Sequence, residues 1–399
     1  MAEGRLGSTH GIGGVVMTDV ERAPRGLRVL HLIDSGGLYG AERMLLALVA
    51  EQIRQGLAPM ILSAGEPGID VKPLETEARR LGLPVTAWRM RPGLNLREAW
   101  RIAARARSGR YQVLHAHGYK FNILLALLPR RVRGRDSVFV TTLHGYLRAP
   151  FATRLWVYEQ LDRLALRRAQ AVVIVAESMR PLLPRIQGRN GRRLVFIPNG
   201  IDPAPPEPLP LPPEIAAFTR RYRTNMVVVG RLSREKGLTD LLEAVAGARA
   251  ELEDVGFTLI GDGPLRTALE AHIAAEGLQE RFLLPGYLDG VAAHLGHFDA
   301  LLLPSWTEGL PITVLEALRA GCPVIATRVG ELPSVLGDCP GAALVPPHRP
   351  AELAAAIVRQ ANTAPGAAPS IASEERFRSE YTASTMAARY LSLYAATRG

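Results

Sequence analysis

Short apolar segments that are typical of buried strands alternate with longer helical segments, and this alternation runs twice along the chain. In the first half the expected strands are residues 27–33, 58–65, 111–117, 137–146 and 171–178. In the second half they are residues 224–232, 256–263, 281–287, 299–305, 322–327 and 342–347. Strands that alternate with helices form parallel sheets with helices on both faces. The chain of 399 residues is therefore predicted to form two doubly wound α/β domains.

A proline-rich segment, residues 203–213, divides the two halves and has the composition of a linker or stiff loop. We expect a first domain over residues 27–202 and a second over residues 214–383. The last helix, about residues 384–399, lies outside the alternation, and we expect it to pack back on the first domain.

Residues 1–26 are glycine-rich and lack the apolar centre of a signal peptide, so we expect a disordered extension. The sequence allows either Met1 or Met17 as the start. No apolar run approaches the roughly 18 residues that a membrane span needs. The two cysteines, Cys322 and Cys339, have no metal-ligand spacing and favour a reducing compartment, which predicts a cytoplasmic protein.

Positive charge is concentrated in one half of the chain. Residues 1–200 carry 31 Lys and Arg against 15 Asp and Glu, whereas residues 201–399 carry 17 against 23. Such asymmetry indicates an anionic partner for the first half. No nucleic-acid recognition module is recognisable, so nucleic acid is not expected. The basic segment 150–170 either lies on an anionic bilayer, at the inner face of the plasma membrane, or buries its aromatic side chains in the core.

Two glutamates, Glu308 and Glu316, lie on either side of the turn between an expected strand and the helix that follows it. The carboxyl edge of an open parallel sheet is where ligands bind, and amides at a helix start attract phosphate. The residues alone leave a metal or acid–base pair open. They equally suit one carboxylate near a sugar and one near a ribose, with a phosphate between them.

Arg231 and Lys236 also follow a strand and precede a helix. Two fixed cations at such a place suit a diphosphate; the alternative is an ordinary basic turn. Lysine is rare in this arginine-rich chain, which favours a function for Lys236. Gly261 and Gly263 form a turn after the next strand, but their spacing alone is weak evidence for a nucleotide site.

The first half offers fewer candidates. Gly36 and Gly37 follow its first strand, either to let the backbone approach a ligand or simply to make a tight turn. His117 and His144 each end a strand and precede a glycine. A histidine at the carboxyl end of a strand is a candidate site residue, and we favour a function for His144 over His117.

Four segments together resemble the retaining glycosyltransferases of family 4, which have the two-domain GT-B fold. They are GRLSREKG (230–237), GDGP (261–264), the stretch with Glu308 and Glu316, and IPNGID (197–202). The resemblance implies two Rossmann-like domains that face a cleft, with a nucleotide-sugar, UDP- or GDP-linked, on the second domain. The run after residues 322–327 departs from the family pattern, so Glu331 is given no role.

The resemblance also implies roles for the candidate residues. Arg231 and Lys236 would hold the diphosphate, Glu316 the ribose, and Glu308 the hydroxyls of the donor sugar. The remaining donor-binding positions are backbone amides, glycine turns and the base contact: Gly36, Gly37, Gly261, Gly263, Tyr287, Gly309, Leu310, Val314 and Leu315. His144 would lie near the reacting sugar, and with Arg231, Lys236 and Glu308 it forms the expected catalytic group.

The implied activity is retaining transfer of a hexosyl group to a glycan or lipid-linked acceptor, at the cytoplasmic membrane face, in cell-surface polysaccharide or glycolipid synthesis. No Asp-x-Asp pair ends a strand, so no cofactor and no essential metal are expected. Two alternatives remain open. One is a nucleotide-sugar epimerase of the same fold, which needs no acceptor; the other is a non-catalytic protein that binds sugar nucleotides.

Overall fold

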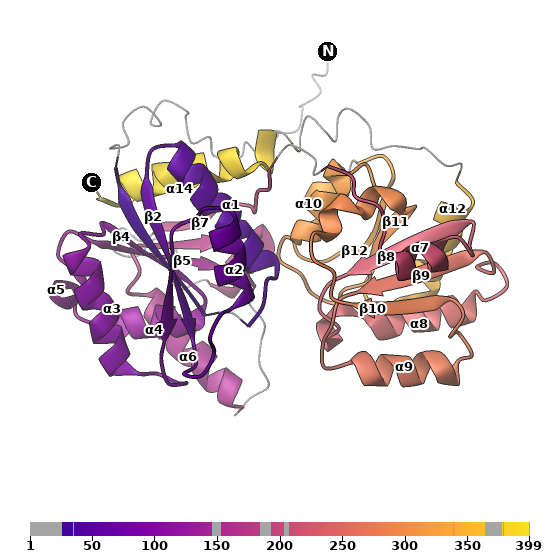
Figure 1. Cartoon of the computed structure of the whole chain (residues 1–399), viewed down its shortest axis with the longest axis horizontal. Coiled ribbons are helices and arrows are strands. Elements are labelled where there is room, and N and C mark those ends of the chain that lie inside the picture. The colour runs from indigo at the N-terminus through magenta and orange to yellow at the C-terminus, as the bar shows by residue number, and fades with distance from the viewer. Residues whose placement is uncertain are drawn as a thin grey trace, which may run out of the picture.

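Two α/β domains lie side by side in the computed structural model of the chain (Figure 1). The structure describes residues 26–34, 36–145, 153–183, 193–202, 207–337, 339–363, 377 and 379–398. The expected extension over residues 1–26 lies almost wholly outside the described residues, as do residues 203–206 of the connector.

The first domain contains a seven-stranded sheet of order β3-β2-β1-β4-β5-β6-β7, in which every pair of neighbours is parallel. Its strands are β1 (Arg28–Asp34), β2 (Ala58–Gly65), β3 (Val85–Arg89), β4 (Val113–His117), β5 (Val138–Leu143), β6 (Ala171–Ile174) and β7 (Arg193–Phe196). Its helices are α1 (Gly40–Arg54), α2 (Pro73–Arg80), α3 (Leu96–Ser108), α4 (Tyr119–Leu127), α5 (Arg130–Arg133), α6 (Arg154–Leu166) and the 3₁₀ helix η2 (Glu177–Leu182).

The second domain contains a six-stranded parallel sheet of order β10-β9-β8-β11-β12-β13. Its strands are β8 (Thr224–Val229), β9 (Val255–Ile260), β10 (Phe282–Gly286), β11 (Ala300–Leu303), β12 (Val324–Thr327) and β13 (Ala342–Val345). Its helices are α7 (Pro213–Thr219), η3 (Arg234–Lys236), α8 (Leu238–Gly247), α9 (Arg266–Ala275), η4 (Val291–Ala293), η5 (Leu295–His297), α10 (Ile312–Arg319), α11 (Leu332–Leu336) and α12 (Pro350–Ala361).

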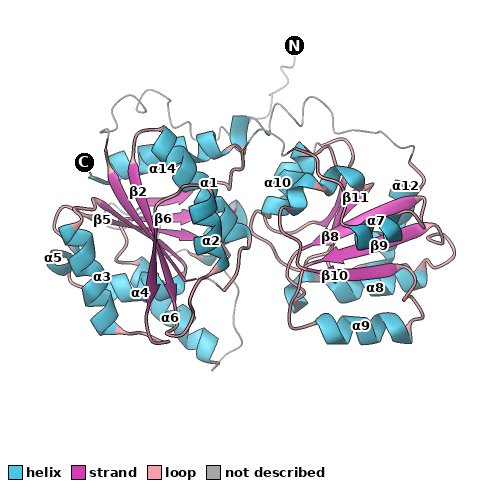
Figure 2. Cartoon of the chain, viewed as in Figure 1, coloured by secondary structure: helices cyan, strands magenta, loops and turns pink. Residues whose placement is uncertain are grey.

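Helices cover both faces of each sheet (Figure 2), so the central strands are buried throughout and have apolar runs rather than an alternating pattern. The strand order reverses between β1 and β4 in the first sheet and between β8 and β11 in the second. In open α/β sheets, the crevice beyond the carboxyl ends of such strands is where ligands bind. The predicted fold of two doubly wound domains is confirmed.

Two strands and several strand ends differ from the sequence prediction; the strands expected over residues 137–146, 224–232 and 256–263 end at Leu143, Val229 and Ile260. The edge strands β3 and β7 were not predicted, because they are short and half-buried and therefore lack a continuous apolar run. The strand expected over residues 171–178 ends at Ile174, and η2 begins three residues later.

The chain crosses between the domains twice, and the two crossing segments lie together. The Ile201 amide donates to the Tyr381 carbonyl at 2.9 Å, and the Ala383 amide donates to the Ile201 carbonyl at 2.8 Å. A Cβ atom on Gly200 would lie 2.2 Å from the Thr382 carbonyl oxygen, so this approach requires glycine. Beyond the crossing, helix α14 (Ala383–Arg398) lies along the first domain (yellow in Figure 1).

Within the part of the chain that the structure describes, no helix is both long and apolar enough to span a membrane.

Candidate active site

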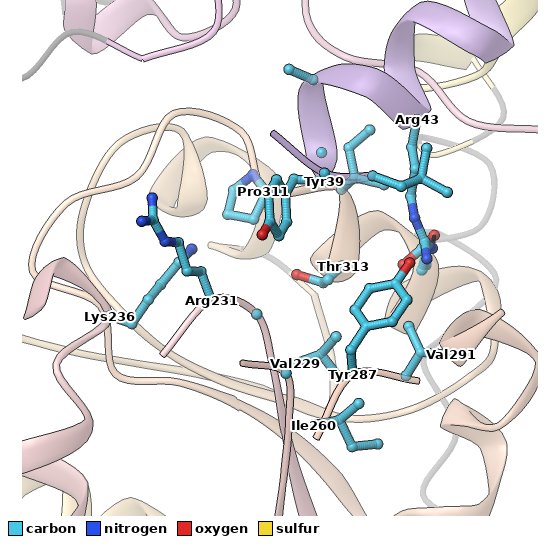
Figure 3. Close-up of a pocket in the computed structure, with 18 of the residues that line it drawn as sticks. Tyr39, Arg43, Val229, Arg231, Lys236, Ile260, Tyr287, Val291, Pro311 and Thr313 are labelled. Carbon is cyan, nitrogen blue, oxygen red and sulfur yellow. Dashed lines mark hydrogen bonds and ion pairs between the residues drawn. The ribbon is translucent and has the colours of Figure 1, made fainter. Parts of the chain in front are cut away.

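A cavity of about 600 Å³ lies between the domains, at the carboxyl ends of β1, β5, β8, β9 and β11 (Figure 3). This volume is in the usual range for small-molecule sites. Most of the predicted site residues meet here, from both domains: Gly36, Gly37, His144, Arg231, Lys236, Gly261, Tyr287, Glu308, Gly309, Leu310 and Glu316.

Lys236 and Glu308 form an ion pair on one side of the cavity. Lys236 Nζ lies 2.7 Å from Glu308 Oε1, and Ser305 Oγ donates to the same carboxylate oxygen at 2.6 Å. The Arg231 side chain lies beside Lys236 (Figure 3). The two cations therefore lie together at the end of β8, with the Glu308 carboxylate already oriented by Lys236 and Ser305.

Glu316 lies on the other side, in α10, and pairs with a residue that the sequence reading did not select. Arg43 Nη1, from α1 of the first domain, lies 3.3 Å from Glu316 Oε1. The second oxygen, Oε2, is buried and has no hydrogen-bond partner among the described residues. Burial raises the pKa of Glu316 against the opposing charges of Arg43 and Arg319. Glu316 thus retains one buried acceptor for a ligand hydroxyl.

The start of α10 lies between these two carboxylates, but its cavity-facing residues lie two positions before the expected Val314 and Leu315. The Val314 amide donates to the Pro311 carbonyl at 3.2 Å, and the Val314 and Leu315 side chains are buried in the core. Ile312 and Thr313 line the cavity instead. Their amides occupy the first helical positions, which have no acceptor within a helix and attract anions.

The glycine turns have different functions. A Cβ atom on Gly261 would lie 1.8 Å from the Gly230 carbonyl oxygen, so the floor of the cavity requires glycine at this position. Gly263 does not line the cavity; it packs against the backbone of Leu232. Gly36 and Gly37 line the cavity from the first domain.

His144 follows β5 and lies across the cavity from the second domain. A Cβ atom on Gly309 would lie 3.1 Å from the His144 carbonyl oxygen, so the two domains approach closely here. Burial lowers the pKa of His144 to about 4, and the ring is therefore neutral at pH 7. Its Nε2 lies 3.1 Å from Nδ1 of His117.

Tyr287 and Leu310 complete the predicted set. Tyr287 follows β10 and lines the cavity, and its ring lies beside the Arg43 side chain (Figure 3). Leu310 is buried, and its carbonyl accepts a hydrogen bond from Asn199 Nδ2 at 2.9 Å.

Comparisons with known proteins agree with this geometry. The description "Glycosyltransferase Family 4" matches residues 39–205, and "Glycosyl transferases group 1" matches residues 223–362, so each domain has its own match. The chain belongs to the family 4 glycosyltransferases.

Named relatives of this glycosyltransferase include the 2-deoxystreptamine glucosyltransferase of Streptomyces kanamyceticus, 29% identical over 79% of this chain and 87% of the relative. The 2-deoxystreptamine N-acetyl-D-glucosaminyltransferase of Streptomyces fradiae is 27% identical over 77% of this chain and 79% of the relative. Among solved structures, Anabaena HepE in complex with UDP has a TM-score of 0.71 at 20% identity, covering 91% of this chain and 98% of that one. The predicted GT-B fold and glycosyltransferase activity with nucleotide-sugar donors are confirmed.

Three residues that join the two domains of the glycosyltransferase could not be predicted from the sequence. Arg43 lies in the first turn of α1, after the glycine turn, and nothing in the sequence marks its partner 273 positions away. Asn199 belongs to the recognised segment 197–202, and its contact with Leu310 gives that segment a structural function. Glu331, to which no role was given, accepts the Glu177 amide at 2.8 Å and joins the two domains.

The glycosyltransferase has a second cavity, of about 470 Å³, within the first domain. Its lining includes Asp34, His117, Tyr119, Lys120 and Tyr158. Lys120 Nζ lies 2.6 Å and Lys72 Nζ 3.4 Å from the Asp34 carboxylate, so two of the rare lysines converge at this cavity. His117 of this lining contacts His144 of the interdomain cavity, so the two cavities meet at this pair of histidine rings.

Proposed function

We propose that the protein is a retaining glycosyltransferase that moves a sugar from a UDP-sugar in the interdomain cavity to a hydroxyl of a carbohydrate acceptor held by the first domain. The observation that carries this proposal is the arrangement of the cavity. Arg231, Lys236 and the start of α10 face one region, Glu316 has a free oxygen at a second, and His144 faces them from the other domain.

The donor is proposed to bind along this row of groups. The diphosphate takes the positive region formed by Arg231, Lys236 and the amides of Ile312 and Thr313. The ribose donates hydrogen bonds to Glu316, and the donor sugar to Glu308. UDP is favoured as the nucleotide because HepE, which has the same fold, was solved in complex with UDP. The base then lies near Tyr287.

Retention is proposed to need no protein base beneath the sugar. The bond between C1 and the phosphate oxygen breaks while the acceptor oxygen bonds to C1 on the same face, and the acceptor proton passes to the departing phosphate. The protein's contribution is charge stabilisation on that phosphate by Arg231, Lys236 and helix amides. Neutral His144 contributes hydrogen bonding rather than charge, since burial holds its pKa at about 4.

The acceptor is proposed to occupy the second cavity and to reach the donor past His117 and His144. Tyr119 and Tyr158, with ring centroids 5.8 Å apart, offer apolar faces for a sugar ring. Asp34 and Lys120 offer an acceptor and a donor for its polar groups. The relatives that act on 2-deoxystreptamine, as their names state, favour a polyhydroxylated ring as acceptor, free or as the end of a glycan or lipid-linked chain.

Peripheral contact with an anionic membrane is part of the proposal for a lipid-linked acceptor. Helices α4 and α6 pack against each other and leave large apolar side chains exposed: Leu127, Val157 and Leu164. The half of the chain that contains them holds 31 of the 48 basic residues. Sedimentation with vesicles tests this point: binding to phosphatidylglycerol vesicles and not to neutral ones at 0.1 M salt supports it, and no binding to either contradicts it.

Turnover tests the proposal as a whole. A thermal-shift screen with UDP-, GDP- and ADP-sugars identifies the donor, and UDP release with a panel of aminocyclitols, oligosaccharides and lipid-linked sugars identifies the acceptor. The anomeric coupling in the product's proton NMR spectrum must match that of the donor. Inversion contradicts retention, and isomerisation of the nucleotide-sugar without an acceptor supports the epimerase alternative.

A further inference from the structure

A buried row of histidines leads from the cleft into the first domain. His31 lies on β1 and His115 and His117 on β4, in a parallel register that pairs His31 with His115. His144 follows β5. The first three are almost wholly buried, and burial lowers the pKa of all four, so each ring is neutral at pH 7. Four neutral imidazoles packed together constrain one another's hydrogen positions.

Three of these rings form an unbranched hydrogen-bonded chain. His144 Nε2 lies 3.1 Å from His117 Nδ1, and His117 Nε2 lies 3.1 Å from His31 Nδ1. His31 Nε2 then lies 2.9 Å from the amide oxygen of Gln52 on α1. One end of the chain is the cleft, and the other is a glutamine side chain that is not among the residues lining the cavity.

The chemistry of the Gln52 end determines every hydrogen along this chain. A neutral imidazole has one N–H donor and one acceptor nitrogen, whereas an amide oxygen only accepts. His31 Nε2 must therefore carry a hydrogen, and its Nδ1 accepts from Nε2 of His117. In turn, Nδ1 of His117 accepts from Nε2 of His144. The Nδ1 atom of His144 is left as an acceptor, and it has no hydrogen-bond partner among the described residues.

The C-terminal helix contacts the other end of the Gln52 amide. Gln52 Nε2 donates to the Tyr394 hydroxyl at 3.4 Å. That hydroxyl lies 2.7 Å from Nδ1 of His115, and Nε2 of His115 lies 2.8 Å from the Thr142 hydroxyl. If the Tyr394 hydroxyl accepts from Gln52 and donates to Nδ1 of His115, then Nε2 of His115 donates to Thr142, and each of these three contacts has one donor and one acceptor. Helix α14 is thus linked to the orientation of the Gln52 amide.

A metal centre is the competing interpretation of this cluster. Ligand atoms of His31, His115 and His117 lie within 4.8 Å of one another, a spacing that allows a metal ion. However, both nitrogens of each of these rings already have hydrogen-bond partners. A ring that binds a metal gives up one of these bonds, so the complete set of contacts favours hydrogen bonding.

We propose that Gln52 is a positioning residue for glycosyl transfer: through His31 and His117 it fixes the tautomer of His144, so that His144 Nδ1 accepts a hydrogen bond from a substrate hydroxyl. The inference rests on the proposed function, in which His144 lies beside the reacting sugar. A flipped Gln52 amide would reverse every bond in the chain and turn Nδ1 into a donor. The distinction is therefore between an acceptor and a donor at the same point of the cleft.

Nitrogen NMR of the full-length protein with ¹⁵N-labelled histidine tests the tautomer without substrate, because protonated and unprotonated ring nitrogens differ in chemical shift. We expect His144, assigned by its loss in His144→Gln, to be protonated at Nε2 only. In Gln52→Leu the second tautomer of His144 appears. Gln52→Glu, which keeps an acceptor oxygen facing His31, restores the first. Gln55→Leu, at the C-cap of the same helix, leaves the spectrum unchanged.

Kinetics provide the second readout. Gln52→Leu is expected to lower kcat about tenfold, with the donor KM within about twofold, as for one hydrogen bond used in the transition state. Gln52→Glu should recover most of the loss, and Gln55→Leu should lose nothing. If Gln52→Leu does not fold, as judged by thermal melting, Tyr394→Phe replaces it, since it frees the Gln52 amide to rotate.

Four outcomes overturn the inference. They are a wild-type His144 protonated at Nδ1, a tautomer unmoved by Gln52→Leu, an altered tautomer with unchanged kcat, or stoichiometric zinc by elemental analysis. Failure of the proposed function is recognised separately, because it removes turnover with every acceptor and leaves the NMR result intact.

Discussion

Arg43 of the first domain and Glu316 of the second form an ion pair across the cleft, with 3.3 Å between Nη1 and Oε1. Glu316 is the residue proposed to bind the ribose, so the cation occupies one of its two oxygens while the other remains unpaired. The same arginine lies 3.9 Å from Asp289. A bound nucleotide therefore competes with Arg43 for Glu316, and Asp289 is a second carboxylate for the displaced guanidinium.

Replacing Glu316 by Gln should weaken donor binding more than it slows chemistry. The ribose loses a charged acceptor, worth about 1.5 kcal/mol or tenfold in affinity. We expect the donor KM to rise about tenfold, with kcat within about threefold. Glu352→Gln, an exposed carboxylate at the start of α12, is the matched control and should change neither constant. Unchanged KM in Glu316→Gln contradicts the ribose assignment.

Replacing Lys236 by Met should slow the chemical step more than it weakens donor binding. The charge that Lys236 neutralises develops as the phosphate departs, so its loss is expressed in kcat, by about 10²-fold to 10³-fold. Arg234→Met changes a neighbouring cation of the same turn whose guanidinium lies over the Trp306 ring, and it should retain most of the activity. A discontinuous assay of UDP release gives kcat for both variants. Equal losses in the two variants show that net charge, rather than the position of Lys236, accounts for the effect.

The buried histidines predict a loss of stability in mild acid. Burial lowers the pKa of His31 and His144 to about 4, so between about pH 6.5 and 4 the unfolded chain binds protons that the folded one does not. Stability is then full above pH 6.5 and declines as the pH falls. Each such histidine contributes about 1 to 2 kcal/mol between pH 7 and pH 5.

Urea unfolding at pH 7 and pH 5 measures this contribution. His144→Phe should have a smaller stability difference between the two pH values than the wild type. His272→Gln, which changes a histidine that is partly exposed on α9, should keep the wild-type difference. Identical pH dependence in the wild type and His144→Phe contradicts burial of a neutral ring at that position.

Turnover is expected to persist without divalent metal, because cations and helix amides of the chain surround the proposed diphosphate position. Dialysis against EDTA should leave the rate of UDP release within about twofold of the untreated enzyme. A rate abolished by EDTA and restored by Mg²⁺ would make the metal, rather than Arg231 and Lys236, the principal counter-charge.

The fold could be predicted from the sequence because a buried parallel strand is a largely apolar run, as in residues 300–303. Edge strands such as β3 lack that run, and they were missed. Glu308, Lys236 and Arg231 could be selected because each lies in the turn between a strand and the next α-helix, so local order along the chain places it at the carboxyl edge.

The remaining parts of the site depend on contacts between the domains, which no local pattern encodes. Arg43 meets Glu316, Asn199 meets Leu310 and Glu331 meets Glu177 only once both domains are folded. Val314 and Leu315 were selected as phosphate-binding positions because the first residue of α10 is not fixed by sequence to within one turn. The histidine chain was missed for a similar reason. His31 lies on β1, His117 on β4 and His144 after β5, and they meet only when these strands pair in the sheet.

A crystal structure of the protein with UDP tests the central claim most directly. We predict the diphosphate beside Arg231, Lys236 and the start of α10, and the ribose hydroxyls within hydrogen-bond distance of Glu316, with Arg43 displaced toward Asp289. A nucleotide bound in the first-domain cavity, or bound in the cleft with its ribose away from Glu316, would contradict the assignment of this site.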